Sequence, residues 1–81
     1  MILRPVQCRM ARAALGMGVR DLAAAAKVSV DTVARFERGE DLKERTIDAL
    51  QHALETAGIN LIDENGGGPG VRLKKKRHKK N

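Results

Sequence analysis

The sequence predicts an all-α fold of four helices, followed by a short β-hairpin and a basic tail. Three observations predict it. Apolar residues recur at helical spacing in four segments before Gly58. After Gly58, apolar and polar residues alternate on both sides of a glycine-rich stretch, which is typical of a hairpin. The last residues, 74–81, are mostly Lys and Arg and predict a disordered basic tail.

The length of 81 residues allows a single domain, which we divide into three parts. Residues 1–58 form the helical region, residues 59–73 the hairpin and residues 74–81 the tail. The net charge of +6 is concentrated at the end, because residues 1–70 hold 9 Lys or Arg against 10 Asp or Glu, whereas residues 71–81 hold 7 Lys or Arg and no acid. The helical region is therefore close to neutral.

The single cysteine, Cys8, excludes an intramolecular disulfide and favours a reducing, cytoplasmic setting. No apolar run approaches the ~18 residues of a membrane span, so we expect no membrane association. With one Phe and no Trp or Tyr, the core has to be built from Leu, Ile, Val, Ala and Met.

The first helix is expected to begin at Pro5, because proline loses nothing in the first helical turn. An inward stripe of Cys8, Ala11 and Leu15 follows at helical spacing. Before this helix, Met1 to Leu3 are expected to form a frayed arm.

The second helix begins at Val19 and places Leu22, Ala23 and Ala26 on one face. A tight turn around Lys27 separates it from a third helix. In this turn Lys27 has to adopt a left-handed conformation, at a cost on the order of 1 kcal/mol.

The third helix has clear end signals. Ser29 is a good N-cap, and Gly39 can take the left-handed conformation that closes a helix. Val33 and Phe36 lie three residues apart and share the buried side. The residues that this leaves on the outer face are Val30, Asp31, Ala34, Arg35 and Arg38.

The fourth helix is expected to open with a capping box, in which Asp41 is the N-cap and Glu44 lies three residues on. Its inward residues are Ile47, Leu50, Ala53, Leu54 and Ala57. His52 and Asp48 lie one turn apart, which is an incomplete metal site, so we interpret His52 as a surface residue.

The hairpin pairs the segment after Gly58 with the segment ending at Leu73, around the turn Asn65 to Gly70. An isolated two-stranded hairpin is marginal in water, and its free edge can pair with another strand. This leads to the hypothesis that two copies of the chain form a homodimer through this element.

The segment from Leu22 to Gly39 resembles the helix-turn-helix of Cro-like and phage-repressor-type (XRE family) DNA-binding proteins. The likeness is carried by Leu22-Ala23, Val28-Ser29, Thr32-Val33 and Phe36-Glu37-Arg38-Gly39. The family fold that it implies is lambda-repressor-like. Two positions depart from the family pattern: Lys27 stands where glycine is usual in the turn, and Val19 stands where glutamine often opens the first of the two helices.

The resemblance implies a set of functional positions in this chain. Base-reading candidates on the third helix are Val30, Asp31, Thr32 and Arg35, of which Arg35 is the strongest because its planar fork matches the acceptors of guanine. Backbone-holding positions are Ser29, Arg38, Lys43 and Arg45. The resemblance also implies a structural ion pair between Arg12 and Glu37.

The expected function is therefore a dimeric transcriptional regulator, most simply a repressor, that binds a palindromic operator in double-stranded DNA. The sequence leaves two alternatives open: an antitoxin-like module that binds a toxin or another protein partner, and a non-specific nucleic-acid binder acting through the tail. An enzyme is disfavoured, because no nucleophile and base pair, phosphate loop, cofactor motif or metal motif is present.

Overall fold

The computed structural model describes residues 2–74, which form four helices and a two-stranded antiparallel sheet. The helices are α1 (Pro5–Leu15), α2 (Val19–Ala26), α3 (Val30–Glu37) and α4 (Glu44–Ala57), and the strands are β1 (Ile59–Ile62) and β2 (Gly70–Leu73). The predicted helices and hairpin are confirmed, while residues 75–81 of the predicted tail lie outside the described residues.

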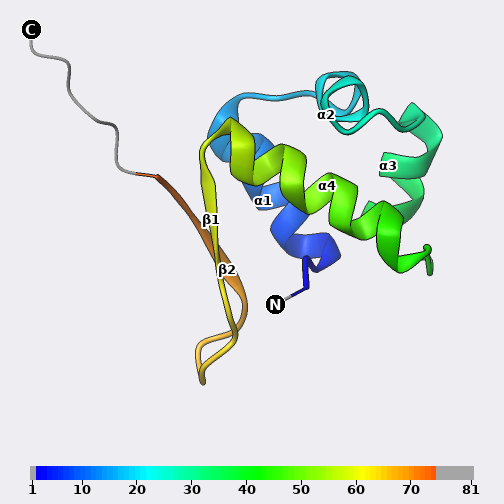
Figure 1. Ribbon diagram of the computed structural model, residues 1–81. Helices are drawn as coiled ribbons and strands as arrows, with labels where there is room; N and C mark the ends of the chain where they lie inside the picture. The colour runs from blue at the N-terminus through cyan, green and yellow to red at the C-terminus, as the bar shows by residue number, and fades with distance from the viewer. Residues whose placement is uncertain (1, 75–81) are drawn as a thin grey trace, which may run out of the picture.

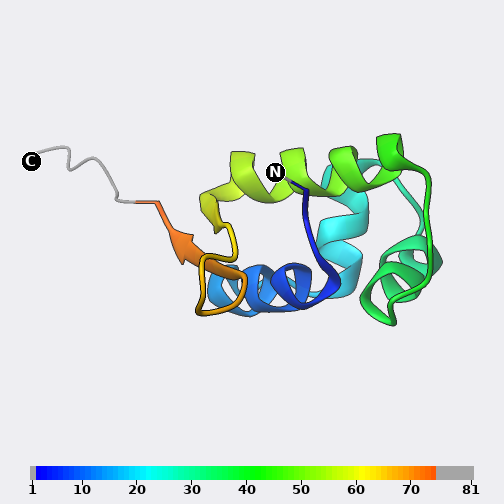
Figure 2. The same ribbon diagram turned by 90° about the horizontal axis from the view of Figure 1, so that it is seen from below.

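Helix α1 is the central element of the arrangement, since it packs against α3, α4 and both strands. Figures 1 and 2 show the hairpin at one end of the molecule and α3 at the other, with α4 running along α1 between them. Helix α2 packs against both α3 and α4. The surface that α3 presents to solvent therefore lies far from the hairpin.

The core is built from aliphatic side chains and one aromatic ring, as the composition requires. Its buried members are Leu3, Cys8, Ala11, Leu22, Ala23, Val33, Phe36, Leu50, Ala53, Leu54 and Ile59. The expectation that Ala57 faces inward is wrong, because this last residue of α4 is exposed where the chain turns away at Gly58.

The N-terminal segment differs from the expected frayed arm. Leu3 is only 2% exposed and belongs to the core. Its backbone N–H also donates a hydrogen bond of 3.0 Å to Oε1 of Gln51 in α4. Apolar burial and a side-chain partner from a distant helix fix this residue, and neither could be seen in the local sequence pattern.

The start of α4 is also different from the expected one. The helix begins at Glu44 with Lys43 as its extended N-cap residue (φ −64°, ψ 144°), so Asp41 does not cap it and the predicted capping box is absent. Leu42 packs against the core instead. This contact explains why the residues between Gly39 and Glu44 form a non-helical connection, although the capping-box pattern predicts that the helix begins after Asp41.

The hairpin pairs β1 with β2 in the register Ile59 to Leu73, Leu61 to Val71 and Ile62 to Gly70. The backbone N–H of Lys74 donates to the carbonyl of Gly58 at 2.7 Å and extends the pairing by one step. Ile59 is fully buried in the core, and Leu61 and Val71 pack against it, so the hairpin is attached to the helices by one face.

A buried glutamine ties the turn end of the hairpin to α1. The Nε2 group of Gln7 donates to the carbonyl oxygens of Ile62 and Gly70, at 3.1 and 3.0 Å. Its Oε1 accepts from the backbone N–H of Arg4 at 2.9 Å. Gln7 is 1% exposed, so one amide connects both strands with the start of α1 inside the protein.

None of the helices in residues 2–74 combines the length and the apolar character that crossing a membrane requires.

Candidate nucleic-acid interface

The turn between α2 and α3 depends on a left-handed lysine. Lys27 has φ 60° and ψ 44°, and it is the one non-glycine residue with positive φ among residues 2–74. The N–H of Val28 donates to the carbonyl of Ala23 at 3.0 Å, which closes α2. The expected conformation of Lys27 is confirmed, and a side chain other than glycine here carries a steric cost.

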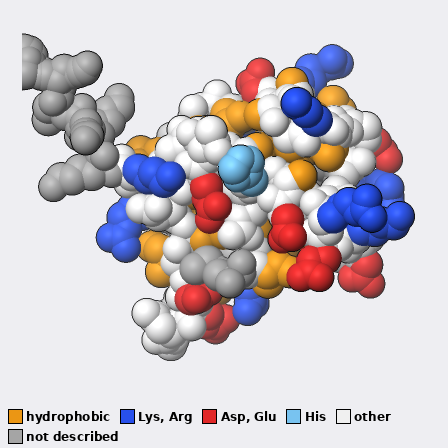
Figure 3. All heavy atoms as spheres, viewed as in Figure 1, with side chains coloured by type: hydrophobic (Ala, Val, Ile, Leu, Met, Phe, Trp, Pro, Cys, Tyr) orange, Lys and Arg blue, Asp and Glu red, His pale blue; other side chains and the backbone are white. Residues whose placement is uncertain are grey.

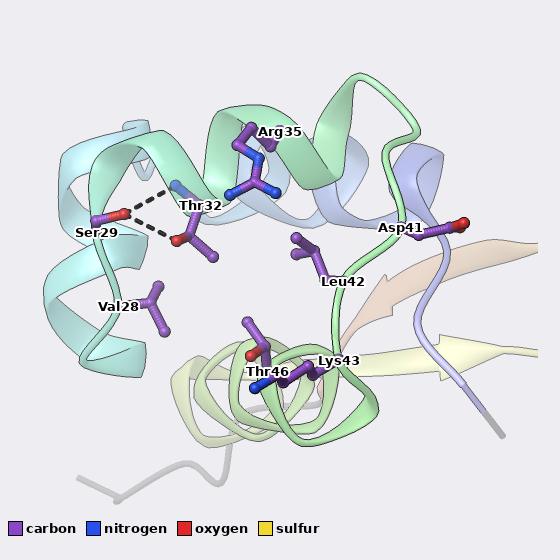
Figure 4. A pocket seen from close by; sticks show the side chains of 8 residues that line it. All are labelled: Val28, Ser29, Thr32, Arg35, Asp41, Leu42, Lys43 and Thr46. Carbon is purple, nitrogen blue, oxygen red and sulfur yellow. Dashed lines mark hydrogen bonds between the residues drawn. The ribbon is translucent and has the colours of Figure 1, made fainter.

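Ser29 caps the start of α3, which confirms the predicted N-cap. Its Oγ accepts a hydrogen bond of 3.0 Å from the backbone N–H of Thr32, and it lies 2.8 Å from the Thr32 hydroxyl (Figure 4). The cap satisfies an N–H group that would otherwise lack a partner. Lys27 and Ser29 together therefore determine the direction of α3 relative to α2.

The two faces of α3 differ as the spacing predicts. Val33 and Phe36 are buried against the other helices. Val30 and Asp31 are exposed at the start of the helix, and Val30 is 43% exposed although it is apolar. An exposed, short helix of this kind with few bulky groups at its start can enter the DNA major groove.

An open groove of about 520 Å³ lies between α3 and the start of α4. Figure 4 shows the side chains of Thr32 and Arg35 directed into it from α3. Its lining comprises Val28, Ser29, Thr32, Arg35, Asp41, Leu42, Lys43 and Thr46. The structure thus brings four predicted site residues, Ser29, Thr32, Arg35 and Lys43, around one groove.

The other predicted site residues surround this groove without lining it. Val30, Asp31, Arg38 and Arg45 are all exposed. Figure 3 shows Lys and Arg side chains gathered at the end of the molecule where α3 and the start of α4 lie, with Asp and Glu side chains beside them. This end combines a cationic surface with hydroxyl groups, a suitable combination for a phosphate backbone.

Glu40 is a residue of this surface that the sequence interpretation missed. Gly39 adopts φ 92°, and the N–H of Glu40 donates back to the carbonyl of Arg35 at 3.1 Å. The carboxylate of Glu40 then accepts from Nε of Arg35 at 3.0 Å. It also accepts from Nε and Nη2 of Arg38, at 3.2 and 2.9 Å.

One carboxylate therefore contacts the two arginines to which the sequence interpretation gave different roles. The hydrogen bonds from Arg38 and Arg35 lower the pKa of Glu40, so it is ionised near neutral pH. Periodicity could not reveal this cluster, because Glu40 lies beyond the end of α3 and reaches back only through the left-handed Gly39. The one signal in the sequence was the close spacing of Arg35, Arg38 and Glu40.

Arg12 and Glu37 lie behind this surface and join α1 to α3. The Nε and Nη2 groups of Arg12 each donate to one Glu37 carboxylate oxygen at 2.8 Å. Arg12 Nη1 also donates to the carbonyl of Met17 at 3.2 Å, and Nη1 of Arg9 donates to the backbone carbonyl of Glu37. Two arginines of α1 thus fix the last turn of α3 through Glu37.

The electrostatics of this pair follow from its partial burial. The side chains of Arg12 and Glu37 are 20% and 9% exposed. Burial is the largest single influence on Glu37 and would raise its pKa. The hydrogen bonds from Arg12 and Cys8 and the charges of Arg12 and Arg9 together outweigh burial, so the pKa is lowered. Burial raises the pKa of the neighbouring Cys8 thiol, so this cysteine is a neutral core residue.

His52 is exposed on α4. Within residues 2–74, no three His, Cys, Asp or Glu side chains come close enough together to hold a metal ion.

A family model described as a helix-turn-helix domain matches residues 6–63 of the chain, from the start of α1 to just beyond β1. No curated protein matches the chain.

Proposed function

Because the chain belongs to the helix-turn-helix domain family, we propose that it is a sequence-specific transcriptional regulator, most simply a repressor, that binds double-stranded DNA in the cytoplasm. The observation that carries the proposal is the geometry of α3. This helix is capped at Ser29, closed by Gly39 and buried on one side only, so its outer face is presented to solvent at one end of the molecule.

In the proposed complex, α3 lies in the major groove and its outer face meets the base edges. Arg35 reads a guanine through its terminal nitrogens, and Val30 makes an apolar contact, most simply with a thymine methyl group. Thr32 and Asp31 are the further base-reading positions. Asp31 is tolerated next to the polyanion where it accepts a hydrogen bond from cytosine N4.

Phosphate contacts hold the protein in register. Ser29 and Lys43 border the groove between α3 and α4, while Arg38 and Arg45 flank it on the exposed surface. A DNA strand that follows this groove would meet all four side chains. The geometry of the groove supports their assignment as backbone contacts.

We further propose that the regulator is a homodimer formed through the hairpin. The two-stranded sheet lies at the opposite end from α3, and a second copy can add its own strand to the edge of the sheet. Two recognition helices in successive major grooves, ~34 Å apart, would then read a palindromic operator.

Selection of binding sites from a random duplex library at ~150 mM salt tests this function. The full chain is compared with a version truncated after Leu73, which retains both strands. An enriched palindrome recovered by both versions would support a specific dimeric regulator.

The other outcomes lead elsewhere. Uniform recovery that disappears on truncation would assign binding to the tail alone. No recovery by either version would overturn the proposal, and the helical region would then be tested for a protein partner such as a toxin. The mass measured by sedimentation at micromolar concentration tests the dimer, because a monomer mass contradicts it.

A further inference from the structure

Arg35, Arg38 and Glu40 form a three-residue cluster on the surface that is proposed to meet DNA. The side chains of the three residues are 41%, 58% and 46% exposed. Ion pairs with this exposure contribute little to folding stability, because solvent screens them and ordering the side chains opposes them. A stabilising role therefore does not explain why a carboxylate is held here, next to the site of a polyanion.

The geometry divides the Arg35 guanidinium into a held part and a free part. Glu40 accepts a hydrogen bond from Nε, and the two terminal nitrogens of Arg35 have no hydrogen-bond partner among residues 2–74. The terminal nitrogens form the edge that matches O6 and N7 of a guanine. Glu40 thus binds the Arg35 guanidinium at Nε and leaves the two terminal nitrogens free to contact a base.

The position of Glu40 is itself fixed by the backbone. The turn at Gly39 and the hydrogen bond from the Glu40 N–H to the Arg35 carbonyl hold the carboxylate over the last turn of α3. A flexible arginine that is oriented before binding loses less conformational freedom on contact with a base. Orientation therefore favours the correct base pair over a mismatched one.

The contact between Glu40 and Arg38 lowers the affinity of the protein for DNA of any sequence. Glu40 Oε2 accepts two hydrogen bonds from this guanidinium and offsets its charge. A phosphate has to compete with the carboxylate for the same donors. The cluster therefore weakens sequence-independent attraction.

From these contacts we infer that Glu40 is a positioning residue that sets the sequence selectivity of the proposed DNA site. It does so by orienting Arg35 toward a base and by weakening the contact of Arg38 with a phosphate. This inference rests on the proposed function. In this inference Glu40 contacts neither base nor phosphate. It determines how strongly Arg35 contacts a base and how strongly Arg38 contacts a phosphate.

The test begins with the duplex that the wild-type protein enriches from the random library. A second duplex carries a change at the base pair where Arg35→Ala loses its preference. Selectivity is the ratio of the two dissociation constants, measured by fluorescence anisotropy at several salt concentrations. We expect Glu40→Gln to lower this ratio about tenfold, which lies within the range of one bidentate arginine–guanine contact.

The same variant is expected to bind unrelated duplexes more tightly. Its plot of log association constant against log salt should become steeper by about 0.9 at most, because Arg38 no longer shares its charge with a carboxylate and neutralises its phosphate more fully. Glu40→Asp keeps the charge but shortens the reach. This variant should lose selectivity without the gain in general affinity, which separates orientation from charge.

Glu44→Gln is the matched control, because Glu44 is an exposed acid in the first turn of α4 at the same end of the molecule. It should leave the selectivity ratio unchanged. The double variant Arg35→Ala/Glu40→Gln should be no less selective than Arg35→Ala alone, since the two residues act through one contact.

Unchanged selectivity in Glu40→Gln, or an equal loss in Glu44→Gln, would overturn the inference while leaving the proposed function intact. A wild-type protein that enriches no duplex would instead overturn the proposed function and the role of Glu40 with it. Circular dichroism of each variant checks that the helices are retained.

Discussion

The guanidinium of Arg12 in α1 and the carboxylate of Glu37 in α3 face each other through two hydrogen bonds of 2.8 Å. This pair is only partly open to solvent, and it connects the helix that contacts most of the fold with the end of the helix that carries the candidate site. It therefore contributes both to stability and to the position of α3.

Arg12→Ala should destabilise the protein by on the order of 3 kcal/mol, because the nearly buried Glu37 carboxylate loses its partner. For a domain of this size each 1 kcal/mol lowers the melting temperature by about 4–8 °C. Thermal unfolding followed by circular dichroism measures the change. Glu64→Gln is the control: Glu64 approaches Arg4 at 3.9 Å on an exposed surface, and its loss should cost less than about 0.5 kcal/mol.

The stability of the protein should fall in acid partly because of Glu37. Its pKa is lowered in the folded state, so its contribution is complete above the ordinary glutamate pKa of about 4.3 and is lost as the pH falls through the folded value. Urea unfolding between about pH 6 and pH 3 should show a smaller loss of stability for Glu37→Gln than for the wild type. Equal slopes for the two proteins would contradict this assignment.

Gln7→Leu should loosen the hairpin. The substitution leaves the half-buried carbonyls of Ile62 and Gly70 without their side-chain donor, at a cost of about 1 kcal/mol or more. Amide exchange should rise in β1 and β2 more than in α2 or α3, which lie away from the hairpin. Exchange that rises equally in all elements would mean that Gln7 stabilises the whole core without a particular effect on the sheet.

Lys27→Gly should stabilise the protein by up to about 1 kcal/mol, because glycine adopts the left-handed conformation of this turn without steric cost. The gain is limited by the greater freedom of glycine in the unfolded chain. The reverse comparison is Gly39→Ala, which places a Cβ at φ 92° and should be destabilising. Gly67→Ala, which has no positive φ and no atom within 4 Å of the new Cβ, should be close to neutral.

The two arginines of α3 should differ in their effect on DNA binding. Arg35→Ala should relax preference at one base pair by about 1–3 kcal/mol, whereas Arg38→Ala should weaken binding to all duplexes alike, by about threefold. Titration of both variants against the enriched duplex and its single-base-pair changes measures the difference. Identical behaviour of the two variants would show that the roles are wrongly assigned.

Local signals made much of the fold predictable. Pro5, Ser29 and Gly39 each act within one helical turn, so the sequence alone locates the start of α1 and both ends of α3. The alternation around the glycine-rich turn likewise located the hairpin. Such signals depend on backbone geometry that neighbouring residues determine.

Contacts between distant residues were not predictable in this way. Gln7 bonds to residues 55 and 63 positions away, and nothing around it in the sequence shows that its amide is buried. Leu3 and Leu42 similarly owe their places to packing against the core. Glu40 was missed because the left-handed turn that brings it to Arg35 interrupts helical spacing.

The distance between the hairpin and α3 has a consequence for any assembly that the hairpin forms. The two elements stand at opposite ends of the molecule, with α1 and α4 between them. A small change in the tilt of the hairpin on α1 would produce a larger displacement at α3. The spacing between two half-sites would then be tuned by residues such as Gln7, which lie far from the DNA and leave the choice of bases untouched.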